Sequence, residues 1–433
     1  MRSTLILSLA LAAGALFATA AEASALKLVY SFCDARRCRD GVAPMELSRD
    51  ATGNLFLVVG DFKRRLGGLI VELAHGKTPR TLYRFPCDDG ICPNGAGPVG
   101  PLVVDVRGNL YGVTYAGGAH NQGTVFKLTP GAKDWTLATL YDFCAQGGDA
   151  CTDGKQPVGL TYAGAASGQP YDGTSPLYGT ASGGANGVAF MLQPADGPWT
   201  ETVLYSFCAL AQCADGAGPW MPPIMDGAGN LFGVAVIGGG GDNGAIYELS
   251  PSGGGAWVEK VVHNFCQEAL CTDGDYPNTA VAFDADGNLW GTTLEGGTHC
   301  KAATWQSCGV IYKLGPDGSS YTVLHSFCQQ SDCKDGTFPN GIVPSPDGGV
   351  YGTTFDGGGN PDGQGSGHSG GTVYRLDGSG FKILHRFCAE TDCTDGAAPF
   401  AAPILDGDGT LYGTVFDGGA NNGGAVFKVA RPD

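Results

Sequence analysis

One short phrase recurs seven times along the 433 residues of this chain, and its spacing constrains the fold more than any other feature. The phrase is an aromatic residue or histidine, one further residue, phenylalanine and cysteine, with one extra residue in the second copy. The copies begin at Tyr30, Tyr83, Tyr141, Tyr205, His263, His325 and His385. Their phenylalanines are 53 to 64 residues apart. That period is too long for most solenoid repeats and suits a unit of four strands with their turns.

Each unit contains four apolar stretches separated by Gly, Pro, Asp and Asn. In one unit the first three are Pro98 to Asp105, the Leu-aromatic-Gly segment that starts at Leu110, and Thr124 to Leu128; the fourth type runs into the Phe-Cys pair, as in Thr202 to Phe207. Alternating segments rich in Val, Tyr, Phe and Thr between such turn residues are typical of β-strands. The sequence therefore predicts an all-β fold, a seven-bladed β-propeller with four antiparallel strands in each blade.

The two ends of the repeat array predict how the ring closes. After residue 25 the chain begins with a strand of the fourth type, Leu26 to Phe32, and it ends after a strand of the third type, Ala425 to Val429. The N-terminal strand can therefore complete the last blade and leave no unpaired edge there. We expect residues 26–433 to form one propeller domain.

The N-terminus has the features of a secretory signal peptide. Met1-Arg2 is followed by an apolar stretch from Leu5 to Ala21 and by Ala23-Ser24-Ala25, a small-residue cleavage site. The alternative is a membrane anchor, which the shortness of the apolar stretch disfavours. We expect residues 1–25 to be removed and the protein to be exported to the periplasm or the extracellular space.

Amino-acid composition and net charge exclude several classes of fold and of binding partner. With 43 % hydrophobic and 15 % charged residues the chain has enough apolar surface to fold, and its 73 glycines show no three-residue period, which excludes collagen. A formal net charge of −17 repels phosphate groups, so neither nucleic acid nor an anionic membrane is an expected partner. No other apolar run approaches the roughly 20 residues that span a bilayer, so we expect no membrane span. We expect the protein to be a monomer.

Sixteen cysteines form closely spaced pairs along the sequence. In an exported chain this pattern indicates disulfides. Structural zinc is the alternative, but it needs a second pair of ligands nearby, which this sequence does not offer. The predicted disulfides are Cys33–Cys38, Cys87–Cys92, Cys144–Cys151, Cys208–Cys213, Cys266–Cys271, Cys300–Cys308, Cys328–Cys333 and Cys388–Cys393.

A second phrase carries a resemblance to a known family. Leu110-Tyr111-Gly112-Val113-Thr114 is followed by Gly117-Gly118 and then by Asn121 to Leu128, and the same order recurs in most units. This arrangement resembles the GloVer tandem-repeat family of secreted bacterial proteins over nearly the whole mature chain. The resemblance implies an extracellular β-propeller-like repeat protein, and it implies no catalytic residues. Members of that family often end in a surface-anchoring tail; none stands here, which favours release or periplasmic retention.

The candidate ligand-binding residues are those that depart from the repeat. Trp220, Tyr276, Phe338 and Phe400 stand next to the prolines that open the first strands of blades four to seven. First strands line the channel of a propeller, so these aromatic side chains could stack on sugar rings or hold a peptide. The alternative is packing between neighbouring blades. Glu46 is the one acid in its row of the repeat, and a lone carboxylate is not a catalytic site.

Two further sets of polar residues follow the repeat. Six aspartates open the Asp-Gly turns, with Asn94 in the remaining copy; they could bind calcium near the channel mouth, or each could cap a turn, which Asn94 favours. They are Asp40, Asp153, Asp215, Asp273, Asp335 and Asp395. His263, His325 and His385 occupy the tyrosine position of the repeat, which indicates structural substitution. We expect no cofactor, because the one stretch that begins like a calcium loop, Asp284 to Asn288, lacks the closing glutamate.

These observations favour a non-catalytic binding or scaffold module whose ligand, a carbohydrate or a protein, binds at the channel face. The alternative is a polysaccharide-active enzyme, a lyase or glycosidase, with its site at the channel mouth. Such an enzyme would use irregular residues, namely Glu46, His299 and His368; His120 is a further histidine on a loop of that face. The paired acids or grouped bases that such chemistry requires do not stand out in the sequence.

Overall fold

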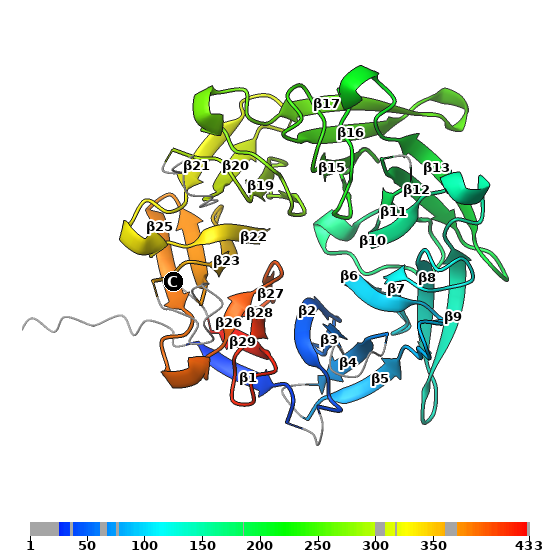
Figure 1. Ribbon diagram of the computed structural model, residues 1–433, viewed down its shortest axis with the longest axis horizontal. Coiled ribbons are helices and arrows are strands. Elements are labelled where there is room, and N and C mark those ends of the chain that lie inside the picture. Colours follow the sequence, from blue (N-terminus) through cyan, green and yellow to red (C-terminus); the bar gives the residue numbers. More distant parts are fainter. Residues whose placement is uncertain are drawn as a thin grey trace, which may run out of the picture.

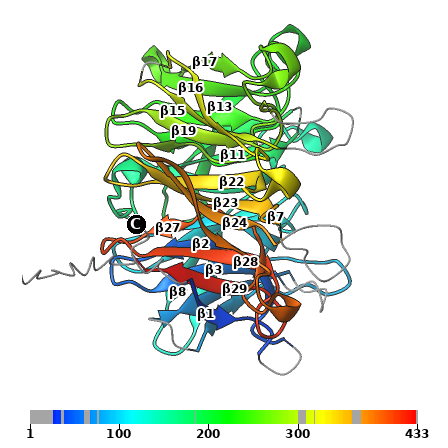
Figure 2. The same ribbon diagram turned by 90° about the vertical axis from the view of Figure 1, so that its left-hand side faces the viewer.

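Seven four-stranded antiparallel sheets form a closed ring in the computed structural model (Figure 1). The structure describes residues 26–34, 38–60, 67–74, 78–184, 186–298, 308–316, 318–359 and 370–430. The predicted all-β propeller with seven blades is confirmed. The strands run across the thickness of the ring, as the side view shows (Figure 2). The predicted signal peptide, residues 1–25, lies outside the described residues.

In blades 1 to 6 the strands follow one another from the channel outwards. Blade 1 contains β2 (Val42–Arg49), β3 (Leu55–Gly60), β4 (Leu69–Leu73) and β5 (Arg80–Arg84). Blade 2 contains β6 (Ala96–Val104), β7 (Leu110–Ala116), β8 (Thr124–Pro130) and β9 (Trp135–Asp142). Blade 3 contains β10 (Lys155–Tyr162), β11 (Leu177–Gly183), β12 (Val188–Gln193) and β13 (Thr200–Ser206).

The next three blades repeat this order. Blade 4 contains β14 (Ile224–Met225), β15 (Leu231–Ala235), β16 (Ala245–Pro251) and β17 (Trp257–Asn264). Blade 5 contains β18 (Ala282–Phe283), β19 (Leu289–Thr293), β20 (Val310–Leu314) and β21 (Thr322–Ser326). Blade 6 contains β22 (Thr337–Pro344), β23 (Val350–Asp356), β24 (Thr372–Asp377) and β25 (Gly380–Arg386).

Blade 7 is assembled from both ends of the described chain. Its inner strand is split into β26 (Ala397–Pro399) and β27 (Ile404–Leu405), which both pair with β28 (Leu411–Asp417), and β29 (Ala425–Val429) follows. Its outermost strand is β1 (Lys27–Ser31), which pairs antiparallel with β29 from Lys27 opposite Lys428 to Ser31 opposite Ala425 (Figure 1). The predicted closure by the N-terminal strand is therefore confirmed.

The helical segments are short 3-10 turns in loops. They are η2 (Gly148–Ala150), η3 (Ala165–Ser167), η4 (Ala211–Cys213), η5 (Gly253–Gly255), η6 (Ala269–Cys271), η7 (Ser331–Cys333) and η8 (Thr391–Cys393). None of the helices in the described part of the chain has the length and apolarity to cross a bilayer.

The phenylalanine of the Phe-Cys phrase builds the core between blades. All seven copies are at most 2 % exposed. In six blade pairs its ring lies 4.8–5.4 Å, between ring centroids, from the third-strand aromatic ring of the next blade, as for Phe85 and Phe126. The glycine of Leu-aromatic-Gly leaves room for that second ring, because a Cβ on Gly112 would lie 2.7 Å from Phe126.

Blade 1 departs from this arrangement at two positions that face each other. Leu57 stands where the other blades have the glycine, and it pairs with Val71, which stands where they have the aromatic residue. Both are fully buried, and Phe32 of blade 7 belongs to the same apolar cluster. The larger residue has moved from one strand to the other, so the volume between the blades stays filled.

A proline and a glycine join each blade to the next. The glycine before the third strand adopts a positive φ of 81–99°, and its α-carbon faces the proline that opens the following blade. In the pair that closes the ring, a Cβ on Gly424 would lie 2.6 Å from Pro44 Cδ. The seven pairs are Gly68–Pro98, Gly123–Pro157, Gly187–Pro219, Gly244–Pro277, Gly309–Pro339, Gly371–Pro399 and Gly424–Pro44.

Candidate functional site

Seven of the eight predicted disulfides are formed between described residues, with sequence separations of five or seven. In the eighth predicted pair, Cys300 with Cys308, Cys300 lies outside the described residues. Each disulfide closes the loop that leads from the outermost strand of one blade to the innermost strand of the next. In a chain-entropy estimate a loop of about six residues contributes roughly 2 kcal/mol, so the bridges hold these loops rather than replace a core.

The six aspartates of the Asp-Gly turns lie beneath these loops. They are at most 8 % exposed, and the carboxylate of Asp215 accepts hydrogen bonds from the Tyr205 hydroxyl at 2.7 Å and the Ala209 backbone N–H at 2.8 Å. Asp153 and Asp395 have equivalent partners. We expected this ring near the channel mouth, but the bonds to outermost-strand side chains place it beside the outer strands. The N–H donors belong to residues five to eight positions earlier, so each aspartate caps the disulfide loop.

The three repeat histidines belong to the same packing. His385 Nε2 lies 3.1 Å from Asp395, and His325 Nε2 lies 3.4 Å from Asp335. His263 stacks on Tyr321 and His325 on Phe381, each a ring of the next blade, with ring centroids 3.7 Å apart in both pairs. Burial lowers the pKa of His263 to about 4, so its ring is neutral at physiological pH. These contacts support the structural interpretation of the histidines. His299 and His368 lie outside the described residues.

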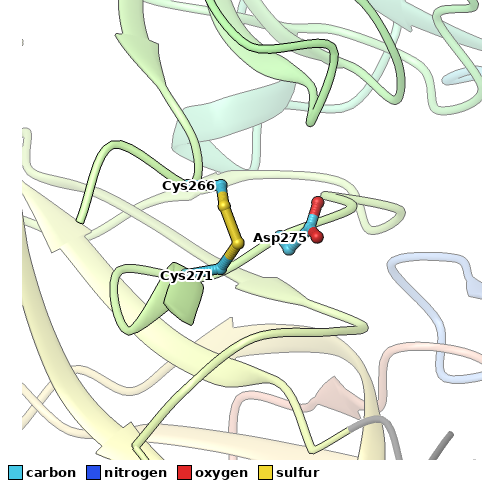
Figure 3. Close-up of side chains that lie close together, drawn as sticks. All are labelled: Cys266, Cys271 and Asp275. Carbon is cyan, nitrogen blue, oxygen red and sulfur yellow. A yellow bond between two sulfur atoms is a disulfide. The ribbon is translucent and has the colours of Figure 1, made fainter. Parts of the chain in front are cut away.

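One group of cysteine and acidic side chains lies close enough together to suggest a metal site. The potential ligand atoms of Cys266, Cys271 and Asp275 are within 4.8 Å of one another (Figure 3). The two sulfur atoms are joined in a disulfide, so neither is a thiolate. One carboxylate remains, which is fewer than the ligands that zinc or calcium requires.

The four predicted aromatic residues all lie where the innermost strands begin. Tyr276 and Phe338 precede the blade-joining prolines and adopt positive φ values of 58° and 53°. Trp220 and Phe400 follow those prolines and are 46 % and 43 % exposed. Exposed apolar side chains indicate a contact surface where several of them lie together. Tyr276 and Phe338 are only partly exposed, so packing accounts for the buried part of each side chain and the rest faces solvent.

Three aromatic residues at the ends of the second strands extend this surface. Phe400 contacts Phe355 and Phe416, with ring centroids 6.5 and 5.7 Å apart. Tyr115 occupies the equivalent position in blade 2 and is 40 % exposed. Sequence reasoning missed these three; the signal was their common place, five residues after the Leu or Val that opens the aromatic-Gly segment, namely Leu110, Val350 and Leu411. We call the seven residues the aromatic face: Tyr115, Trp220, Tyr276, Phe338, Phe355, Phe400 and Phe416.

An acidic pair borders the aromatic face in blade 5. Asp275 and Glu295 exchange two backbone hydrogen bonds of 3.0 Å, so their side chains leave neighbouring points of the sheet edge. Burial, with Glu295 as a further cause, raises the pKa of Asp275 and that of the adjacent Tyr276. Sequence reasoning missed this pair because its members are 20 residues apart and only the strand pairing joins them. The pair supplies hydrogen-bond acceptors beside the aromatic rings.

Glu46 lies in the innermost strand β2 and is partly buried. Burial raises the pKa of its carboxyl group to about 7, and among the described residues no hydrogen bond or ion pair is formed by its side chain. The structure does not bring Glu46 together with Trp220 or Phe400. The central cavity, with a volume of about 930 Å³, is lined by residues at the opposite end of the innermost strands.

Comparisons with known proteins agree with the fold. The pattern of the Gloeobacter/Verrucomicrobia repeat family matches residues 161–365 and 303–433, and no curated protein matches the chain significantly. An ancestral GH74 enzyme, AFV00434, superposes with a TM-score of 0.57 at 10 % identity over 90 % of this chain and 48 % of its own. The extracellular domain of the putative one component system BT4673 from B. thetaiotaomicron superposes with a TM-score of 0.52 at 10 % identity over 93 % of this chain and 39 % of its own. The chain thus spans half or less of these two chains, and the likeness concerns the propeller alone.

Proposed function

We propose that this chain, which belongs to the Gloeobacter/Verrucomicrobia repeat family, is an exported, non-catalytic binding module that holds a carbohydrate chain across the aromatic face. The observation that carries the proposal is the exposure of Trp220 and Phe400 at equivalent places, directly after the blade-joining prolines Pro219 and Pro399. A sugar ring presents an apolar face that stacks on such a side chain. The acidic pair Asp275 and Glu295 would accept hydrogen bonds from sugar hydroxyl groups.

The charge of the chain favours neutral over acidic polysaccharides. With a formal net charge of −17, the protein repels uronate and sulfate groups. The spread of the aromatic face over blades 2 and 4 to 7 suits an extended ligand rather than a single sugar. The seven disulfides between described residues support export, because such bonds persist in oxidising compartments.

The test is retention of the purified mature protein on a panel of insoluble neutral and acidic polysaccharides. We expect retention on at least one neutral polysaccharide, and at least about a tenfold loss of affinity in Trp220→Ala/Phe400→Ala, since stacking contacts contribute about 1 kcal/mol or more each. The matched control is Val258→Ala/Leu324→Ala, which removes two exposed side chains (57 % and 40 % exposed) from the outermost strands β17 and β21. Equal affinity in the two double variants would refute the aromatic face as the binding site.

The same incubation distinguishes the other functions. New chain ends would identify a polysaccharide-active enzyme, and Glu46→Gln and Asp275→Asn would then be the first substitutions to examine for lost turnover. If the protein is neither retained on any polysaccharide nor produces new chain ends, the search turns to a protein ligand. In each case the double variant of the aromatic face remains the informative one, because a protein partner would also use exposed aromatic side chains.

A further inference from the structure

The second feature of the ring that could hold a ligand is its central cavity. All seven blades contribute to it, and its lining includes one residue in or next to each of six innermost strands, namely Leu47, Val104, Ile224, Val281, Val343 and Leu405. The aromatic face lies where the same strands begin. Because β2 spans Val42–Arg49 at about 3.3 Å per residue, the two places are separated by roughly 20 Å. The cavity is therefore a site of its own.

The walls of the cavity are mainly apolar, and many of them face open space. Val104, Ile224, Val343, Ile404 and Leu405 line the cavity and are all only partly buried. A volume of about 930 Å³ lies within the range of small-molecule pockets, which are concave and lined mostly by apolar groups.

An insertion found in blade 3 covers part of the cavity. Between β10 and β11 the chain forms η3 and contributes Ala165, Gly168, Gln169 and Pro170 to the lining. The insertion is held at both ends: the Tyr162 hydroxyl donates to Gln169 O at 2.7 Å, and Val106 N–H of blade 2 donates to Tyr171 O at 2.9 Å. Tyr171 itself is 1 % exposed. The insertion is thus a packed part of the fold, and this departure of blade 3 from the repeat lies at the cavity.

The charged groups at the cavity favour a cation over an anion. Arg49 lines the cavity and makes an ion pair with Asp406 at 3.5 Å. Asp406 is crowded by Asp408, since both carboxylates accept the Thr410 N–H, at 3.0 and 2.9 Å. Asp50 is a third carboxylate at the same edge. The charged residues of the lining are Arg49, Asp50 and Asp105, and Asp406 pairs with Arg49 from outside the lining, so carboxylates outnumber the one guanidinium group at this edge.

We propose that the central cavity is a binding site for an apolar small molecule, and that it prefers a molecule with one positive charge to an anionic one of the same shape. The apolar body occupies the space between the seven innermost strands under the blade 3 insertion. The cationic group lies beside Asp50, at the edge where Asp406 pairs with Arg49. This site does not depend on the function proposed for the aromatic face.

Isothermal titration calorimetry with three naphthalene probes tests the proposal on the mature protein. The probes are 2-naphthol, (2-naphthylmethyl)trimethylammonium and 2-naphthoate, which share a ring system and differ in charge. We expect one site per chain for the first two, and at least about tenfold weaker binding of 2-naphthoate. Arg49→Gln should widen the ratio between the cationic and anionic probes. Absence of binding of all three probes at millimolar concentration, or tightest binding of 2-naphthoate, would overturn the proposal.

Variants that fill the cavity locate the binding. Val343→Trp and Ile404→Trp place a larger side chain at half-buried lining positions on two blades, and each should weaken the cationic probe by at least about tenfold. Val258→Trp on the outermost strand of blade 4 is the matched control and should bind as the wild type does. If a filled variant lacks the cooperative melting transition of the wild type, Val106→Trp, at a lining position that is 62 % exposed, replaces it. Unchanged affinity in folded variants would refute the cavity as the site.

Discussion

The contact between Gly244 and Pro277 makes a quantitative prediction about what holds neighbouring blades together. Gly244 of blade 4 adopts a φ of +88°, and a Cβ there would lie 2.5 Å from Pro277 Cδ and 2.7 Å from Ala235 O. Gly229, in the turn between β14 and β15, has nearly the same φ of +89° and nothing within 4 Å. Gly244→Ala and Gly229→Ala therefore share the same backbone penalty and differ in crowding, which at Gly244 comes from Pro277 of the next blade and from Ala235 O of the same blade.

The two variants should differ in stability by the cost of crowding. A positive φ costs an alanine about 1–2 kcal/mol relative to glycine, and this is all that Gly229→Ala should lose. In Gly244→Ala the new methyl group displaces Pro277, at a further cost of about 1–3 kcal/mol. The same shift disturbs the Tyr276 N–H bond to Asn243 O, which is 3.2 Å long. The expected losses are thus about 1–2 and about 2–5 kcal/mol.

Urea denaturation at 25 °C with intact disulfides measures both losses, because the free energy of unfolding falls linearly with denaturant. Heat is the less sensitive probe here. A chain of about 400 residues has an unfolding entropy so large that 1 kcal/mol moves the melting temperature by only about 1 °C. Equal losses of stability in the two variants would refute the reasoning, because the contact with Pro277 would then contribute nothing beyond the backbone conformation.

Two further predictions concern the cores between blades. Val71→Phe and Leu57→Gly should each destabilise blade 1, whereas the double variant, which restores the arrangement of the other blades, should recover about 1–3 kcal/mol of coupling in a urea double-mutant cycle; strictly additive losses would contradict this. Burial and the nearby Asp153 raise the pKa of Glu201, on β13, to about 8. The contribution of this carboxyl group to the free energy of unfolding is fully present below pH 4.5, the pKa of the group in the unfolded chain. That contribution is lost as the pH rises through about 8, the pKa in the folded chain. Between pH 5 and pH 8.5 the stability of Glu201→Gln relative to that of the wild type should therefore rise by at least about 1 kcal/mol. If the urea midpoints of the two proteins change in parallel across that range, Glu201 is not the source of the pH dependence.

The fold could be predicted from the sequence because its determinants recur. Six blades have a glycine where Gly112 meets Phe126, all seven have a glycine where Gly424 meets Pro44, and a requirement repeated around the ring becomes a visible period. Blade 1 shows the limit of this reasoning. The absence of the glycine at Leu57 was visible in the sequence, but its compensation by Val71 became clear only from the strand register.

The candidate site was only partly predictable because its members are joined by contacts across blades. Tyr321 stacks on His263 from 58 residues away, and nothing near either residue indicates the pair. Phe355 and Phe416 escaped notice for a different reason. Their position holds Ser182 and Val236 in other blades, so the repeat does not mark it. The cavity depends on seven strand ends meeting around an axis, which no local pattern encodes.

Because β1 pairs with β29, the ring closes later during synthesis than the disulfides can form. Each disulfide between described residues joins cysteines five or seven positions apart, so each loop can be bridged as soon as its own segment exists. The ring, by contrast, closes only when Ala425–Val429 reaches Lys27–Ser31. Until β29 is made, β1 is an edge strand without its neighbour, and β29 is the last in sequence of the described strands. No covalent bond between described residues fastens that junction, so the ring can open and close again without any change in its disulfides.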